Sequence, residues 1–162
     1  MPEIIIVNTS PLFYFHRLGL LELFQKLYGR IIIPEAVKKE LDEGRTQGED
    51  VPLLEKYPWI EIKSVTMPRY LQLIADLGPG ESEVLALATN QKSALVIIDD
   101  KLARRIAEMR GFRITGSAGV LLKAKRKGLI AEIKPIIKKL LEIDFRLKPN
   151  LIETIIELAG EE

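Results

Sequence analysis

The sequence predicts a three-layer α/β/α fold, in which helices flank a central, mainly parallel sheet of four to five strands. Short β-branched runs alternate with amphipathic stretches of helical spacing, which is typical of parallel strands joined by crossover helices. The inner strand runs are apolar throughout, as strands are when both faces of a sheet are covered. The chain has 162 residues and no internal repeat, low-complexity segment or linker, so residues 1–162 are expected to form one domain.

The first half of the chain is expected to supply three strands. Its clearest helix start is Ser10-Pro11, because serine can cap a helix and proline suits the first helical position. The helical region that follows can break at Gly19. The expected segments are a strand at 4–7, a helical region at 11–28, a strand at 31–33, a helix at 34–44, a loop at 45–58 and an edge strand at 59–65.

Turn formers and acids mark the boundaries in the second half. Gly78-Pro79-Gly80 separates two helical segments, and either Asp99 or Asp100 can cap the helix after the third buried strand. The expected segments are helices at 68–77 and 81–90, a strand at 94–98, a helix to about 110, a strand at 112–115, and helices at about 117–127, 132–143 and 149–159.

The composition narrows the chemistry that the chain can perform. It contains no cysteine, which excludes disulfides, thiolate zinc sites and a cysteine nucleophile. Because His16 is the only histidine, Asp and Glu must supply any acid–base groups or metal ligands, and oxygen ligands favour Mg²⁺ or Mn²⁺ over zinc. The net charge of +1 neither favours nor excludes a nucleic-acid partner.

Two further features concern location and source. No apolar run approaches the ~20 residues of a membrane span, and the first residues lack the basic region of a signal peptide, so a cytoplasmic protein with no membrane partner is expected. Richness in Ile, Lys and Glu is compatible with a thermophilic source.

Polar side chains are expected to gather beyond the carboxyl ends of the strands, where ligands bind in open α/β sheets. Asn8 follows the first strand, and Asp99 and Asp100 follow the third buried strand. At ~100° per residue, Glu40 and Glu81 fall on the apolar stripes of their helices. Carboxylates crowded together repel one another and attract a cation or a proton. A bound Mg²⁺ or Mn²⁺ could orient a water molecule, lower its pKa and stabilise charge on a phosphodiester.

Each acid also has a structural explanation. Glu40 can extend to water from the margin of its stripe, and Glu81 suits the first turn of a helix because the helix dipole favours an anion there. One of Asp99 and Asp100 can simply be a helix cap. The prediction of a site therefore rests on the convergence of these acids and not on any one of them.

Several basic residues are candidate contacts for nucleic acid, whereas the aromatic residues are not. Arg104 and Arg105 on one predicted helix, and Lys123 and Arg126 on another, could contact backbone phosphates, although solvated helix faces look much the same. The aromatic residues at 13–15 are expected to lie in the core or on a dimer surface, so no base-stacking platform is predicted.

Other phosphate chemistries fit poorly. The Gly78-Pro79-Gly80 turn matches neither glycine-rich phosphate motif, which argues against a dinucleotide-dependent dehydrogenase or an NTPase. Asn8 cannot attack phosphorus, which argues against a phosphatase with an aspartyl nucleophile after the first strand.

Five segments, taken in order, resemble the PIN-domain superfamily, and within it a prokaryotic branch of PIN-like proteins of unknown function that are predicted to bind nucleic acids. The segments are VNTSPL at 7–12, Glu40, GPGESE at 78–83, IIDDKLAR at 97–104 and GSAGVLL at 116–122. The resemblance covers residues 4 to about 158. It implies RNA cleavage with Mg²⁺ or Mn²⁺ held by three or four acids. For many relatives it also implies an antitoxin partner and a homodimer.

The resemblance assigns roles residue by residue. It places Asn8, Glu40, Glu81 and one of Asp99 and Asp100 at the four acid positions, with Thr9 and Ser10 as supporting hydroxyl residues. Metal ligation is implied for Asn8, Glu81, Asp99 and Asp100.

This sequence departs from the pattern at two of these places. The family has Asp where Asn8 stands, and the amide lacks the negative charge, so a divalent ion should be held less tightly. Many relatives have Asp where Glu81 stands, and the longer side chain could shift the ion. Two functions follow: a metal-dependent ribonuclease, or a catalytically impaired PIN-like module that binds RNA or a protein partner.

Overall fold

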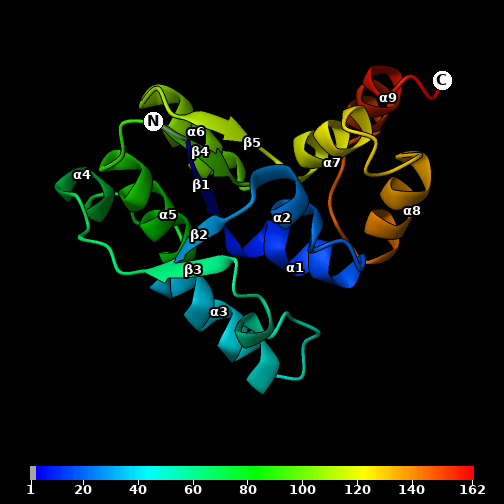
Figure 1. Ribbon diagram of the computed structural model, residues 1–162. Coiled ribbons are helices and arrows are strands. Elements are labelled where there is room, and N and C mark those ends of the chain that lie inside the picture. Colours follow the sequence, from blue (N-terminus) through cyan, green and yellow to red (C-terminus); the bar gives the residue numbers. More distant parts are fainter. Residues whose placement is uncertain (1–2) are drawn as a thin grey trace.

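Five parallel strands form one sheet in the computed structural model, which describes residues 3–162 (Figure 1). The strand order is β3-β2-β1-β4-β5, and the strands are β1 (Ile4–Val7), β2 (Ile31–Pro34), β3 (Ile60–Lys63), β4 (Ala94–Ile97) and β5 (Arg113–Thr115). The predicted parallel sheet is therefore confirmed, with β3 as the predicted edge strand.

The central pair of strands determines where the site lies. β1 and β4 pair from Ile4 opposite Ala94 to Val7 opposite Ile97, so both strands end level with each other. The next residues continue the ladder, since the Asn8 N–H donates to the Ile97 carbonyl oxygen at 3.0 Å. The residues that follow β1 and β4 consequently emerge at the same edge of the sheet.

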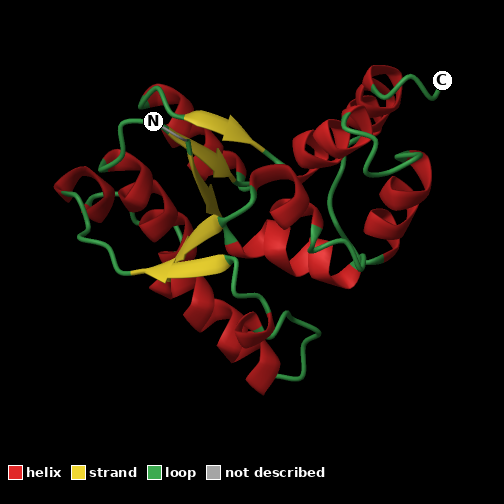
Figure 2. Cartoon of the chain, viewed as in Figure 1, coloured by secondary structure: helices red, strands yellow, loops and turns green. Residues whose placement is uncertain are grey.

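Helices cover both faces of the sheet, which gives the three layers (Figures 1 and 2). α5 and α6 lie on one side, and α1, α2 and α7 lie on the other, while α3 packs along α5 at the β2–β3 edge. The helices are α1 (Thr9–Arg17), α2 (Leu23–Tyr28), α3 (Glu35–Thr46), α4 (Arg69–Gln72), α5 (Pro79–Thr89), α6 (Lys101–Met109), α7 (Ser117–Arg126), α8 (Lys134–Glu142) and α9 (Pro149–Leu158), with a short 3₁₀ turn at Leu54–Lys56.

One predicted helical region is divided at the expected glycine, and another predicted helix is shorter than expected. The helical region at 11–28 divides into α1 and α2 because Gly19 adopts a φ of 72°, a left-handed conformation that glycine accepts most readily. The helix predicted at 68–77 is wrong beyond its first turn, since α4 ends at Gln72. Leu73 is 81% exposed, so continuing this helix would bury little apolar surface.

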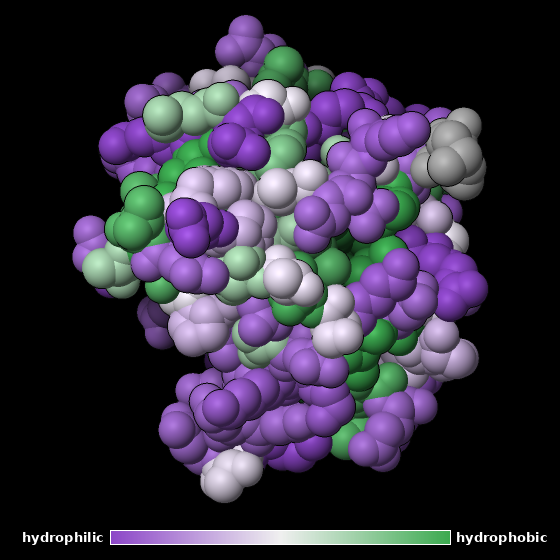
Figure 3. Space-filling model, turned by 90° about the vertical axis from the view of Figure 1, so that its left-hand side faces the viewer, coloured by the Kyte–Doolittle hydropathy of each residue, from purple (hydrophilic) through white to green (hydrophobic). Residues whose placement is uncertain are grey.

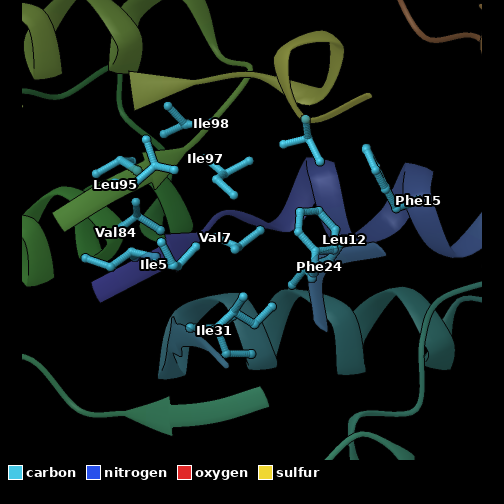
Figure 4. Close-up of a cluster of buried hydrophobic side chains, with 14 of the residues drawn as sticks. Ile5, Val7, Leu12, Phe15, Phe24, Ile31, Val84, Leu95, Ile97 and Ile98 are labelled. Atoms are coloured by element: carbon cyan, nitrogen blue, oxygen red, sulfur yellow. The ribbon is translucent and has the colours of Figure 1, made fainter. Parts of the chain in front are cut away.

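Buried side chains from both faces pack between the helices and the sheet. Figure 4 shows Ile5 and Val7 of β1 beside Leu95 and Ile97 of β4. On the other side of the same cluster, Phe15 and Phe24 bring α1 and α2 together, with ring centroids 4.7 Å apart. This packing fixes the position of α1 relative to the ends of β1 and β4.

The outer surface is mixed in character. In Figure 3, hydrophobic residues form short patches between hydrophilic ones, and the lower part of this face is mostly hydrophilic, with a hydrophobic strip along its right side. None of the helices within residues 3–162 is both long enough and apolar enough to cross a membrane.

Candidate functional site

A cleft of about 630 Å³ opens at the carboxyl ends of β1, β4 and β5. Its polar lining includes Asn8, Ser10, Glu81, Asp99, Asp100 and Arg104. Four of the five residues predicted at acid positions therefore meet in one cleft, and Glu40 lies outside its lining. This is the position that the strand order predicts for a ligand site in an open parallel sheet.

Asn8 is the most buried polar residue of the cleft. It directly follows β1, is 3% exposed, and precedes α1 without capping it through its side chain. Its Oδ1 atom is buried and has no hydrogen-bond partner among the residues described. A buried amide oxygen without a partner is costly, by about 1–3 kcal/mol, so a cation or another donor at this atom would be stabilising.

Glu81 is held in the first turn of α5, half-buried in the cleft. Burial raises the pKa of Glu81, and the negative charges of Glu40 and Asp100 raise it further. Hydrogen bonds from its own backbone N–H and from the Asn8 side chain lower the pKa of Glu81, but by less than burial and the two charges raise it. An ionised Glu81 is therefore short of compensating positive charge, which is the condition under which a carboxylate attracts a proton or a cation.

Glu40 ties three helices together beside the cleft. Its Oε1 accepts a hydrogen bond from Thr9 Oγ1 at 2.5 Å, and its Oε2 accepts one from the Gly80 backbone N–H at 3.0 Å. A Cβ atom at position 80 would overlap the Glu40 carboxylate, so glycine is required for this contact. Thr9, one of the two hydroxyl residues predicted to support the site, thus donates its hydrogen bond to Glu40, at the second acid position.

The two adjacent aspartates have different surroundings. Asp99 accepts hydrogen bonds from the Ser117 N–H at 2.8 Å and the Ser117 hydroxyl at 2.6 Å, so both of its oxygens are occupied. Burial raises the pKa of Asp99, while these bonds and the charge of Arg104 oppose the rise. Asp100 is exposed and is the N-cap of α6, accepting the Ala103 N–H at 2.9 Å. Its second oxygen has room for a further partner.

Of the four predicted basic contacts, the structure places one in the cleft. Arg104 lines it and donates to the Ile98 carbonyl oxygen at 2.9 Å. Arg105 is exposed on α6, and Lys123 lies over the Tyr28 ring, 4.5 Å from its centroid. Arg126 lines a second cavity of about 370 Å³. That cavity shares Thr115 and Gly119 with the cleft, so the two are neighbours.

The sequence reasoning missed one wall of the cleft. This wall consists of Tyr14 from α1 with Asp144, Phe145, Arg146, Leu147 and Leu151 from the α8–α9 region. Tyr14 had been expected in the core or on a dimer surface. The aromatic and basic residues at 145 and 146, placed between two helices, were the only available signal. No local sequence pattern indicates that residues 144–151, which are distant from α1 in the sequence, lie beside α1 in the fold.

The cleft lacks a group of three carboxylates around one point, but it contains oxygen atoms of the type that hard cations bind. Within residues 3–162, no group of three His, Cys, Asp or Glu side chains is close enough to hold an ion. Mg²⁺, however, is commonly bound by one or two carboxylates and keeps several water ligands. The unpartnered Asn8 Oδ1, with the Glu81 and Asp100 carboxylates, supplies that kind of donor set.

Comparison with known protein families identifies a match over nearly the whole chain. The family model DUF3368, described as a PIN domain, matches residues 4–161. The chain has no match among curated proteins. The matched range includes every residue of the cleft, the late segment at 144–151 among them.

Proposed function

The chain belongs to the PIN-domain family, and from this premise we propose that it is a divalent-metal-dependent ribonuclease that hydrolyses RNA phosphodiesters in the acidic cleft. The observation that carries the proposal is the meeting of Asn8, Glu81 and Asp100, where the Asn8 oxygen is unpartnered and burial raises the pKa of Glu81. Such a site repels an RNA phosphate unless a cation offsets the carboxylate charge.

In this proposal, Asn8 Oδ1, Glu81 and Asp100 would hold Mg²⁺ or Mn²⁺. A bound ion would lower the pKa of a water molecule and offset the negative charge of the phosphate. Hydrolysis adds water across one P–O bond: the water oxygen bonds to phosphorus, the bond from phosphorus to the leaving oxygen breaks, and the proton that the water loses passes to the leaving oxygen. Arg104, which lines the same cleft, can pair with a non-bridging phosphate oxygen.

Two acids act as positioning residues in this scheme. Glu40 fixes the start of α5 through the Gly80 N–H, and so fixes Glu81. Asp99 fixes the start of α7 through its two bonds to Ser117. Both acids are therefore required for the shape of the cleft without touching the phosphate.

The alternative proposal is a catalytically impaired PIN-like module that binds RNA or a protein partner. Two observations favour it: a neutral amide stands at the first acid position, and in the part of the chain that the structure describes no three carboxylates lie close enough together to hold an ion. The two proposals differ in whether the donor set around Asn8 is sufficient for hydrolysis.

A cleavage assay separates them. Single-stranded RNA labelled at one end is incubated with Mn²⁺ and wild type, Asn8→Asp, Glu81→Gln or Glu43→Gln, the last being an exposed control on α3. The ribonuclease proposal expects wild-type cleavage that falls by about 100-fold or more in Glu81→Gln and is unchanged in Glu43→Gln. Cleavage that appears only in Asn8→Asp supports the impaired module. Cleavage that survives both Glu81→Gln and EDTA contradicts the metal site.

The same premise suggests partners and a location. We propose RNA as the substrate, an antitoxin protein that restrains the nuclease, a second copy of the chain in a homodimer, and a cytoplasmic location without a membrane partner. Light scattering during gel filtration tests the homodimer directly, because the monomer mass is 18.3 kDa.

A further inference from the structure

The cleft has two chemically distinct walls. One carries Asn8, Glu81 and the two aspartates, and the other carries Tyr14 together with residues 144–151 of the α8–α9 region. In Figure 1 the connection from α8 to α9 runs beside α1. The proposed metal chemistry uses only the first wall, so the second wall needs an explanation of its own.

Backbone structure fixes the second wall in place. Asp144, two residues after the end of α8, has a φ of 67°, a left-handed conformation that few residues other than glycine, asparagine and aspartate adopt. The Phe145 N–H then donates to the Leu140 carbonyl oxygen at 3.0 Å. The Phe145 ring meets the Tyr14 ring edge to face, with centroids 4.8 Å apart and planes at 87°. The aromatic pair is thus held by a defined turn.

The residues on this wall define a class of ligand. Phe145 and Tyr14 are partly exposed and apolar, and Arg146 beside them is exposed and cationic. A flat, uncharged group attached to an anionic group complements such a wall, and a nucleotide has this composition. The volume of about 630 Å³ lies within the usual range for small-ligand sites.

We propose that Tyr14, Phe145 and Arg146 form a subsite for one unpaired nucleobase of single-stranded RNA and its adjoining phosphate. The base packs against the Tyr14–Phe145 pair, and Arg146 contacts the phosphate next to the one at the acids. A duplex is excluded because its paired and stacked bases present no free face to the aromatic rings. The proposal rests on the proposed function for the identity of the ligand, but it concerns binding alone.

The test measures binding without cleavage. A dye-labelled single-stranded RNA is titrated in EDTA with protein carrying Glu81→Gln, which removes the metal chemistry and one repelling charge. Fluorescence anisotropy compares that background with Phe145→Leu, Tyr14→Leu, Phe145→Trp and Tyr57→Leu added. Tyr57 is the matched control, because it is also a partly exposed aromatic residue in an edge-to-face pair, with the Trp59 ring centroid 5.7 Å away, but it does not line the cleft.

We expect Phe145→Leu and Tyr14→Leu to weaken binding about tenfold each, whereas Phe145→Trp, which keeps a ring, and Tyr57→Leu change it less than about twofold. With an oligonucleotide that has the same backbone but abasic sugars, the effect of Phe145→Leu should disappear. Equal binding by the Phe145→Leu protein overturns the subsite, and so does an equal loss with the abasic strand or no RNA binding in the starting protein.

The outcomes distinguish this subsite from the proposed function. If the cleavage assay is negative and Phe145→Leu still weakens binding of the base-bearing strand, the subsite stands in a binding module. If cleavage is metal-dependent and the Phe145→Leu protein binds normally, the ribonuclease proposal stands and the subsite is wrong. Thermal unfolding of each variant identifies loss of binding that is caused by loss of folding.

Discussion

Position 8 carries an amide at the point where β1 ends among carboxylates. We expect Asn8→Asp to lower the stability of the metal-free protein, because a second buried carboxylate would face Glu81. The same change should tighten Mn²⁺ binding, and a tenfold gain corresponds to about 1.4 kcal/mol. The rise in Tm on adding Mn²⁺ should therefore be larger for Asn8→Asp than for wild type, by roughly 2–4 °C for each kcal/mol of additional binding energy.

The control for this prediction is Asn90→Asp, which makes the same chemical change at an exposed residue after α5. It should leave the Mn²⁺ response at the wild-type value. An equal Mn²⁺ response in all three proteins would show that position 8 does not face a cation site.

Glu81 gives a prediction about pH. Because burial raises its folded pKa above that of the unfolded chain, the folded state binds the proton more tightly. The penalty for ionising Glu81 is absent below the unfolded pKa and grows as pH rises through the raised folded pKa. In EDTA, Glu81→Gln should therefore be more stable than wild type near neutral pH and equal to it at low pH.

Urea unfolding of both proteins at about pH 4 and about pH 7 measures this difference. Glu43→Gln, on the exposed side of α3, should show no such divergence. If Glu81→Gln were less stable than wild type at neutral pH, the carboxylate would be compensated by contacts that the structure does not contain.

Helical phase predicted part of the site at this scale. It placed Glu40 on the apolar stripe of its helix, and Glu40 bonds Thr9 and the Gly80 N–H there, whereas Asp42 pairs with Lys38 at 2.7 Å. It could not separate Asp99 from Asp100, because they are adjacent in sequence. The bonds from Ser117 occupy Asp99, and Ser117 reaches it only once β5 has paired with β4.

At the scale of elements, helix propensity and side-chain overlap have opposite effects on stability at Gly80, where α5 contacts α3. Helix propensity alone predicts that Gly80→Ala stabilises the protein by up to about 1 kcal/mol. The added Cβ would overlap the Glu40 carboxylate that bonds the Gly80 N–H. We expect the overlap to dominate and Gly80→Ala to destabilise the protein by about 1–3 kcal/mol.

A double-mutant cycle with Glu40→Ala checks this explanation. Shortening the side chain at position 40 removes the overlap, so Gly80→Ala should become neutral or stabilising in that background. Urea unfolding of the four proteins gives the coupling energy. A coupling energy near zero would mean that Gly80 is required for a reason other than Glu40.

The strands were predictable because a short, continuous apolar run is typical of a strand in a parallel sheet whose two faces are covered by helices. The segment at 68–77 was not, since its composition suits a helix while its surroundings leave Leu73 exposed. Whether a helix face is buried depends on the elements that pack against it, and the periodicity of a single sequence carries no information about those elements.

At the scale of the whole molecule, the end of the chain returns to support the cleft. Lys125 Nζ on α7 donates to Glu161 Oε2 at 2.7 Å and to the Ala159 carbonyl oxygen at 2.5 Å. The Glu161 carboxylate also accepts the N–H groups of Ile133 and Lys134 before and at the start of α8. The two ends of the α8–α9 region are thereby joined, and the second wall of the cleft, which contains Phe145, lies between them. Nothing in the sequence singles out this pair among 24 basic and 23 acidic residues.

Glu161→Gln tests whether these contacts of the Glu161 carboxylate stabilise the fold. Burial of Glu161 raises its pKa, but the bonds from Lys125 and the two N–H groups outweigh burial and lower it from 4.5 to about 2. Ionised Glu161 therefore stabilises the folded state above about pH 4.5, and that contribution is lost as pH falls towards about pH 2. Glu161→Gln should unfold at a lower urea concentration than wild type near neutral pH, with this difference narrowing below about pH 4.5, and the backbone amides of α9 should exchange faster.

Glu162→Gln, one residue later and exposed, is the control and should match wild type throughout. A gap that stayed constant down to about pH 3 would mean that the carboxylate charge is not what holds α9 to α7.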